Sequence, residues 1–269
     1  MPARPMTMKR IAVEEAFVTE EIAREWDRVL ASKFVEPGFR LMGETILGDS
    51  PASRGVHAQL IDLDQGRIAD MDACGIDFAL LSITSPGVQV FDAVTATSLS
   101  THANDVLAEA VRRHPTRFAG LATVAPNHPQ SAVVELQRAA STLGMKGFLI
   151  NSHTQGEYLD DEKFWDIFEA AEALDVPIYI HPNTPSPQMI EPFLSRCLDA
   201  AIYGFQAETG LHALRLIVTG VFDRFPRGQI ILGHMGETLP YMLWRLDSRY
   251  AFTPTRRPIQ RKPSEYVRS

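Results

Sequence analysis

The sequence predicts an α/β protein built as a barrel of parallel strands. Short apolar runs rich in β-branched and aromatic residues recur along the chain, and amphipathic helical segments lie between them. Two of these runs, residues 176–181 and 229–234, end on histidine, and a third, residues 10–14, ends on glutamate. The carboxyl ends of parallel barrel strands meet at one mouth, where such enzymes do their chemistry. We therefore expect these polar side chains to converge on a metal or catalytic site.

Six segments have the composition of strands that are buried on both faces. They are residues 10–14, 78–83, 118–124, 147–151, 176–181 and 229–234. Their alternation with helices predicts parallel pairing through right-handed crossovers. A TIM-type (β/α)8 barrel has eight such units. We therefore expect a barrel of this type that stops after about six β/α units and lacks its C-terminal strands.

The helices are predicted from apolar residues at three- and four-residue spacing. This pattern covers residues 98–113, 129–143 and 161–174, and the last of these opens with acidic residues that suit a helix N-terminus. A further helix is expected over about 237–249, and residues 263–267 have a sequence that can begin another.

The whole chain, residues 1–269, is expected to form a single domain. Residues 18–60 interrupt the alternation after the first strand, and we expect them to be helical over 19–31 and loop-like across 36–55. A long insertion at the mouth end of a strand often shapes a substrate pocket. An inert surface excursion is an equal alternative.

Composition excludes several classes of partner. The chain has 26 Lys and Arg against 33 Asp and Glu, a net charge of −7, which argues against nucleic acid or an anionic membrane surface. No apolar run approaches the roughly 20 residues that span a bilayer, and the N-terminus lacks the apolar core of a signal peptide. The two cysteines, Cys74 and Cys197, lie far apart in helix-like segments. We therefore expect no disulfide and a cytoplasmic location.

The strand ends supply the first candidate site residues. Glu14 and Glu15 follow the first strand, and alternation directs one of them into the barrel and the other toward the helices. A carboxylate inside a barrel is costly unless it is paired or bound to metal, although a salt bridge at the rim is an alternative. His181 and His234 end their strands in the same way. Together these residues favour a metal or catalytic site over separate structural roles.

Further candidates lie outside the strands. His212 and Arg215 occupy adjacent turns of one helix face. Arg54 and Arg245 could hold a carboxylate through forked hydrogen bonds, although a surface position is the more common one for an arginine. The remaining histidines are expected to be structural or exposed: His57, His102, His114, His128 and His153.

Seven stretches also resemble a known family. They are residues 10–17, 67–72, 84–89, 150–156, 179–182, 208–212 and 233–237. In this order they are similar to the metal-dependent decarboxylases of the amidohydrolase superfamily, which act on hydroxybenzoates, and most of all to the branch that acts on 5-carboxyvanillate. Many relatives have Glu-x-His at the end of the first strand, whereas this chain has Ala16 at the second position, as in the decarboxylase branch.

The resemblance implies a role for each matching residue. Glu14 and His181 would be metal ligands, and His234 would hold the metal-bound water or the substrate with support from Glu237. It also implies that Arg54 and Arg245 contact the acidic substrate, and that His212, which matches a pocket histidine, is catalytic. Thr84 and Phe205 are further candidates for lining the substrate pocket. The family takes a further metal ligand, an aspartate, from its eighth strand, and we expect the 269 residues to end before that strand.

The activity implied by the resemblance is non-oxidative decarboxylation of an ortho-hydroxy or methoxy aromatic carboxylic acid. One divalent metal is expected, Mn²⁺ before Zn²⁺, with no organic cofactor, in a homodimer or homotetramer. Two alternatives stay open. The same ligands would serve a hydrolase of a small ester, lactone or amide, and a barrel without turnover would serve as a binding protein for an aromatic acid.

Overall fold

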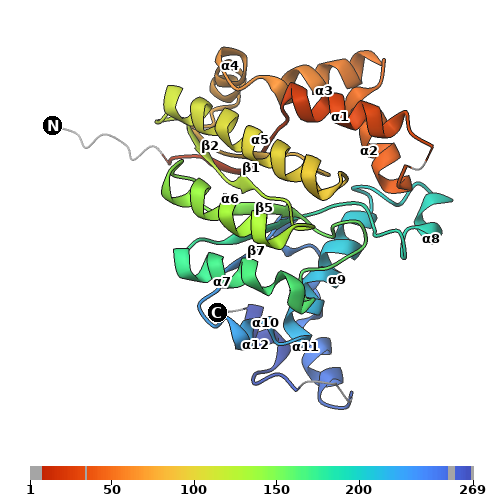
Figure 1. The fold of residues 1–269 in the computed structure, drawn as a ribbon. Coiled ribbons are helices and arrows are strands. Elements are labelled where there is room, and N and C mark those ends of the chain that lie inside the picture. Colours follow the sequence, from red (N-terminus) through yellow and green to blue (C-terminus); the bar gives the residue numbers. More distant parts are fainter. Residues whose placement is uncertain (1–7, 34, 254–257, 268–269) are drawn as a thin grey trace.

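A computed structural model describes residues 8–33, 35–253 and 258–267. Its centre is an array of parallel strands, surrounded by helices (Figure 1). The strands are β1 (Ile11–Phe17), β2 (Phe78–Ile83), β3 (Phe118–Gly120), β4 (Ala122–Thr123), β5 (Phe148–Asn151), β6 (Ile178–His181) and β7 (Ile230–Leu232). They pair in chain order, β1-β2-β3 in one sheet and β4-β5-β6-β7 in the other, and every pair is parallel. This is the parallel α/β arrangement that the sequence predicts.

The two sheets are joined through a single residue. Leu121 separates β3 from β4, and its N–H donates to the Leu81 carbonyl of β2. The next N–H, of Ala122, donates to the carbonyl of Gly147 just before β5. The segment predicted as one strand over 118–124 therefore passes from one sheet to the other. Within the described residues, each of the six predicted segments forms a strand, and these strands lie side by side in the order of the sequence.

Helices follow most strands. They are α1 (Glu20–Leu30), α2 (Pro37–Leu47), α3 (Pro51–Ile61), α4 (Gln65–Cys74), α5 (Ala93–Arg113), α6 (Pro129–Ser141), α7 (Trp165–Leu174), α8 (Glu191–Leu194), α9 (Gly204–Val218), α10 (Val221–Arg224), α11 (Leu239–Tyr250) and α12 (Pro263–Val267). The helix predicted from residue 98 begins earlier, at Ala93, because the Asp92 side chain caps it by accepting from the N–H groups of Val94 and Thr95.

The expectation of a loop across 36–55 is wrong. Residues 37–47 and 51–61 form α2 and α3 instead. Pro37 and Pro51 open the two helices, a position that proline tolerates because the first N–H groups have no partner within a helix. Gly43 lowers the helix propensity of α2 but lets it approach α1, since a Cβ there would lie 2.7 Å from Leu30 Cδ1. Tertiary packing has overridden the local signal.

The helices of the 18–60 segment lie over two loops that follow strands. Trp26 of α1 is completely buried, and its Nε1–H donates to the Gly87 carbonyl in the loop after β2, at 2.9 Å. Gly38 of α2 packs so closely on the loop after β6 that a Cβ would reach 2.1 Å from Thr184 Oγ1. Both loops leave the carboxyl ends of their strands, so α1 and α2 lie at the mouth end of the array.

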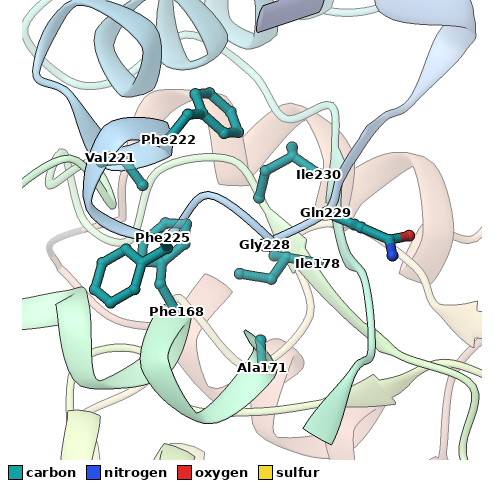
Figure 2. Close-up of a pocket in the computed structure, with 9 residues that line it drawn as sticks. All are labelled: Phe168, Ala171, Ile178, Val221, Phe222, Phe225, Gly228, Gln229 and Ile230. Carbon is teal, nitrogen blue, oxygen red and sulfur yellow. The ribbon is translucent and has the colours of Figure 1, made fainter. Parts of the chain in front are cut away.

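The hydrophobic core continues beneath the strands, between β6, α7 and α10. Phe168 of α7 stacks on Phe225, which follows α10, with ring centroids 5.8 Å apart. These rings line a small cavity of about 10 Å³ together with Ile178, Ile230 and other residues. Figure 2 shows how these side chains lie. The cavity shares no residue with the polar strand ends. Its role is therefore packing.

The structure also bears on the two cysteines and on membrane-spanning helices. Cys74 and Cys197 are free and exposed. Cys197 does not lie in a helix, because it follows α8 in a turn with φ of 54°. No helix among the described residues combines the length and apolar character needed to cross a membrane.

Candidate metal centre

Three side chains from separate strands converge at the mouth. Glu14 comes from β1, His181 ends β6, and His234 follows β7. One ligand atom from each lies within 4.8 Å of the other two. The parallel strands bring these residues together because their carboxyl ends share one edge.

Glu14 is at the centre of this cluster. Its Oε1 lies 3.0 Å from His181 Nε2 and 3.1 Å from His234 Nε2, yet this buried oxygen has no aligned hydrogen-bond partner among the described residues. Its Oε2 accepts from the Tyr179 hydroxyl at 2.6 Å and from the backbone N–H of His234 at 3.3 Å. Burial would raise the pKa of Glu14, but the contacts with both imidazoles and Tyr179 outweigh it and hold the pKa well below its usual range. Glu14 is therefore a carboxylate.

The tautomer of His181 follows from its other ring nitrogen. Nδ1 lies 2.7 Å from the Pro182 carbonyl, which can only accept, so Nδ1 carries the proton. Nε2 is then the nitrogen that faces Glu14 and that would bind a cation. A histidine that binds metal through one nitrogen commonly donates the other N–H in this way.

His234 lies between two carboxyl groups. Its Nε2 faces Glu14, and its Nδ1 is 3.1 Å from Glu237 Oε1. The contact with Glu14 is the main cause of a raised pKa for His234, and Glu237 adds to it against the opposing effect of burial. The ring also lies against Phe205 of α9, with centroids 6.0 Å apart. With its side chain 38% exposed, His234 faces the open side of the site.

The turn that carries His234 is strained. His234, Met235 and Glu237 have φ values of 48°, 58° and 53°, in the left-handed region that residues other than glycine seldom adopt. The sequence predicts the start of a helix here, whereas the structure has a single 3-10 turn over His234–Gly236 before α11 begins. Backbone strain of this kind clusters at functional sites, where the surrounding structure maintains it.

The chain matches one protein family over most of its length. Residues 49–268 fit the model of a family described as amidohydrolase. The chain belongs to this family. The match covers more than half of the chain and includes His181 and His234 of the cluster.

Individual relatives of this amidohydrolase are decarboxylases. A gamma-resorcylate decarboxylase from Polaromonas sp. is 37% identical over 267 residues, which cover 96% of this chain and 76% of the relative. The solved structure of 5-carboxyvanillate decarboxylase from Novosphingobium aromaticivorans, complexed with manganese and 4-hydroxy-3-methoxy-5-nitrobenzoic acid, has a TM-score of 0.93 at 45% identity. That similarity covers 97% of this chain and 76% of the other.

A second solved structure agrees with the first. Dihydroxybenzoic acid decarboxylase from Polaromonas sp., solved with bound manganese and the inhibitor 2-nitroresorcinol, has a TM-score of 0.80 at 34% identity, over 97% of this chain and 76% of that one. The predicted TIM-type barrel fold and the resemblance to the decarboxylases are thus confirmed. Both solved chains extend beyond the part that this amidohydrolase matches.

The other candidate residues differ in burial and in their hydrogen-bond partners. Thr84 is half-buried at the end of β2, where its N–H donates to the Phe17 carbonyl at 2.8 Å. Arg54 is exposed on α3 and donates to the Asp49 carbonyl. Arg245 is exposed on α11. In the part of the chain that the structure describes, neither guanidinium bonds to a residue of the cluster.

His212 is not delivered to the cluster, and its expected catalytic role needs correction. The side chain is completely buried on α9. Its Nε2 accepts from the Leu159 N–H at 3.2 Å, and its Nδ1 lies 3.1 Å from Ser152 Oγ. Burial lowers the pKa of His212 to about 3. With both nitrogens engaged and the ring neutral, His212 holds neighbouring segments together.

Sequence reasoning missed Tyr179. This residue lies within β6 and belongs to a predicted strand and to a stretch that resembles the decarboxylases. No role is assigned to it from the sequence, yet its hydroxyl makes the shortest contact with Glu14. A usable signal existed, because residues two apart on a strand share a face. The expectation that His181 points into the mouth therefore extends to Tyr179.

Proposed function

We propose that this amidohydrolase is a metal-dependent decarboxylase, which releases CO2 from an aromatic carboxylic acid carrying an ortho hydroxyl or methoxy group. The convergence of Glu14, His181 and His234 within 4.8 Å carries the proposal. It is supported by the relatives described above, whose names are those of decarboxylases for gamma-resorcylate, 5-carboxyvanillate and dihydroxybenzoic acid.

The donor set suits one divalent cation. A carboxylate combined with imidazole fits Mn²⁺ and accepts Zn²⁺. Glu14 Oε1 is a buried anionic oxygen without an aligned hydrogen-bond partner in the described structure, which is the feature expected of a ligand atom. We propose Mn²⁺ ahead of Zn²⁺, held by Glu14 and His181 with His234 beside them, and no organic cofactor. Manganese in two solved relatives supports this order.

The cation would supply a Lewis acid and a template for the oxygen atoms of the substrate. The chain itself handles the proton. His234 holds a proton between Glu14 and Glu237, both of which favour its charged form. From the open side of the site it can orient the substrate and support protonation of the ring carbon that bears the carboxylate. The C–C bond then breaks as the ring regains aromaticity.

Location and assembly complete the proposal. The free, exposed thiols of Cys74 and Cys197 fit a reducing cytoplasm. Large apolar side chains are exposed on and before α11, including Met235 at 95%, Tyr241 at 93% and Trp244 at 80%. Such a surface favours association, and we propose a homodimer or homotetramer.

The test is turnover of 5-carboxyvanillate and 2,6-dihydroxybenzoate in deuterated buffer, with metal-free and Mn²⁺-loaded protein compared. Decarboxylation places one deuterium on the carbon that loses CO2, and activity requires the metal. Full activity in chelator would refute the metal-dependent mechanism. Metal-dependent cleavage of an ester, lactone or amide without ring deuteration would identify a hydrolase instead. Tight binding of the acids without turnover would identify a binding protein.

A further inference from the structure

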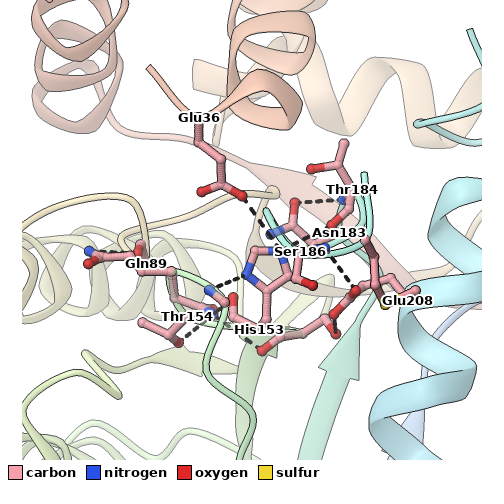
Figure 3. A network of polar contacts seen from close by, with 12 residues as sticks. Glu36, Gln89, His153, Thr154, Asn183, Thr184, Ser186 and Glu208 are labelled. Atoms are coloured by element: carbon pink, nitrogen blue, oxygen red, sulfur yellow. Dashed lines mark hydrogen bonds and ion pairs between the residues drawn. The ribbon is translucent and has the colours of Figure 1, made fainter. Parts of the chain in front are cut away.

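The loop that follows His181, residues 182–187 and here called the β6 loop, is held by buried polar groups from three directions. Asn183 Oδ1 accepts from Ser85 Oγ at 3.0 Å. The Thr184 carbonyl lies 3.1 Å from His153 Nε2, and the Ser186 N–H donates to Glu208 Oε2 at 3.0 Å. Figure 3 shows these contacts as one network beneath α2. The β6 loop is thus fixed from the ends of β2 and β5 and from α9.

His153 is a fixed donor in this network. It is only 2% exposed, and its Nδ1 accepts from the Gly156 N–H at 3.1 Å. The proton must therefore be on Nε2, which donates to the Thr184 carbonyl. Burial lowers the pKa of His153 to about 4, so the ring is neutral near pH 7. Its single tautomer gives the β6 loop a defined anchor.

Glu208 accepts hydrogen bonds from three donors in this network, including the N–H of Ser186 in the β6 loop. It is completely buried and accepts from Ser152 Oγ at 3.1 Å, from the Tyr158 hydroxyl at 3.0 Å and from the Ser186 N–H. His212 fixes the direction of the bond from Ser152. Its Nε2 accepts from the Leu159 N–H, so its Nδ1 carries the proton and donates to Ser152 Oγ, which in turn donates to Glu208. Burial raises the pKa of Glu208 to about 7, while the bonds from Ser186, Tyr158 and Ser152 favour the carboxylate.

The first residue of the β6 loop is confined on its other side by β7. The Gly233 N–H donates to the Ile180 carbonyl at 2.9 Å, and a Cβ at Gly233 would lie 2.6 Å from Pro182 Cδ. Pro182 therefore has little room to move away from His181. Its carbonyl is the group that accepts the His181 Nδ1 proton at 2.7 Å.

We propose that Glu208 and His153 are positioning residues for the metal centre. By anchoring the β6 loop they hold the Pro182 carbonyl against His181 Nδ1–H, which orients the ring so that Nε2 is directed at the cation site. Neither residue contacts the cluster, so each acts through the backbone that follows the ligand. The inference rests on the proposed function only in taking Glu14 and His181 as the metal ligands.

The experiment is calorimetric titration of Mn²⁺ into the metal-free full chain. Glu208→Ala removes the acceptor of the Ser186 N–H, and the affinity is expected to fall about 10- to 100-fold, the range typical of residues that support a ligand. Glu208→Gln can keep its oxygen toward Ser186 and Tyr158 while the Ser152 hydroxyl turns away, so it is expected to stay within about threefold of wild type. Tyr158→Phe is the matched control, because it removes one donor to Glu208 but leaves the loop anchor in place.

A second readout reports on the His181 ring directly. Long-range ¹H–¹⁵N NMR correlations of ¹⁵N-histidine-labelled, metal-free protein should show one state of the His181 ring, with Nδ1 protonated, in wild type and Glu208→Gln, and more than one ring state in Glu208→Ala. A side chain that only stabilised the fold would not change this pattern. If Glu208→Ala does not fold, His153→Leu cuts the other anchor and is expected to show the same losses.

The outcomes separate the two proposals. Wild-type protein that binds no Mn²⁺ would refute the proposed metal centre, while the NMR comparison would still decide the role of Glu208 and His153. Wild-type binding, with Mn²⁺ affinity and His181 ring state both unchanged in the folded Glu208→Ala or His153→Leu variant, would overturn the positioning role. Equal losses in Glu208→Ala and Tyr158→Phe would do so as well.

Discussion

Replacing Glu36 with glutamine should stabilise the protein at pH 8 and have a much smaller effect at pH 5. Glu36 precedes α2, and its side chain is 20% exposed; among the described residues its one ion-pair contact is with His153 Nε2, at 3.8 Å. Burial raises the pKa of Glu36 from 4.5 to about 7. A shift of that size corresponds to roughly 3 kcal/mol.

The sign follows from comparing the folded and unfolded chains. The folded protein holds the Glu36 proton more tightly than the unfolded chain does, so this contribution is complete below pH 4.5 and is lost as the pH rises to about 7. Glutamine removes the ionisation, and the melting temperature at pH 8 should rise by roughly 6–12 °C at about 2–4 °C per kcal/mol.

Thermal unfolding of wild type and Glu36→Gln at both pH values tests this reasoning. Glu44→Gln on the same helix is the control, because the Glu44 side chain is 62% exposed and its replacement should have little effect at either pH. A melting-temperature difference between wild type and Glu36→Gln that is the same at pH 5 and pH 8, or a variant that is less stable at pH 8, would refute the argument.

Other substitutions test the cluster and the core. Glu14→Gln removes the charge on which both imidazoles converge, and Mn²⁺ affinity measured by calorimetry should fall by about 100-fold or more; unchanged affinity would exclude Glu14 as a ligand. Tyr179→Phe removes the 2.6 Å hydrogen bond to Glu14 Oε2 and should weaken Mn²⁺ binding by about tenfold, with an unchanged melting temperature. Phe168→Ala deletes a ring that stacks on Phe225 and should cost about 3–5 kcal/mol in denaturant unfolding, whereas a cost below about 1 kcal/mol would mean that the core collapses around the gap.

The sequence is sufficient to predict Glu14, His181 and His234 as one cluster. The inference needs only that the strands are parallel and that each polar residue ends its strand, and both conditions depend on local composition. The same logic directs Glu15 away from Glu14, and Glu15 Oε2 indeed lies 4.0 Å from Arg67 on the helix side. Convergence of this kind is robust because errors of one or two residues in a boundary do not move a strand end to the other side of the barrel.

The features that escaped prediction depend on contacts between distant segments. Gly43 lowers the helix propensity of α2, and the reason for a glycine there appears only when Leu30 is placed against it. His212 looks like a pocket residue until Leu159 and Ser152 occupy its two nitrogens. The left-handed turn at His234 has no local signature, since only Gly236 within it favours such dihedral angles. In each case the deciding partner lies elsewhere in the chain, beyond the reach of periodicity.

The left-handed turn after β7 also affects which substitutions the chain can accumulate. Met235 is 95% exposed, so by burial alone its position should accept almost any side chain. Its φ of 58° imposes a different rule, because a β-branched residue is strongly disfavoured there, whereas glycine would relieve about 1 kcal/mol or more. Natural variation at this surface position should therefore be filtered by backbone shape, and drift toward valine, isoleucine or threonine would threaten the placement of His234 without touching the site.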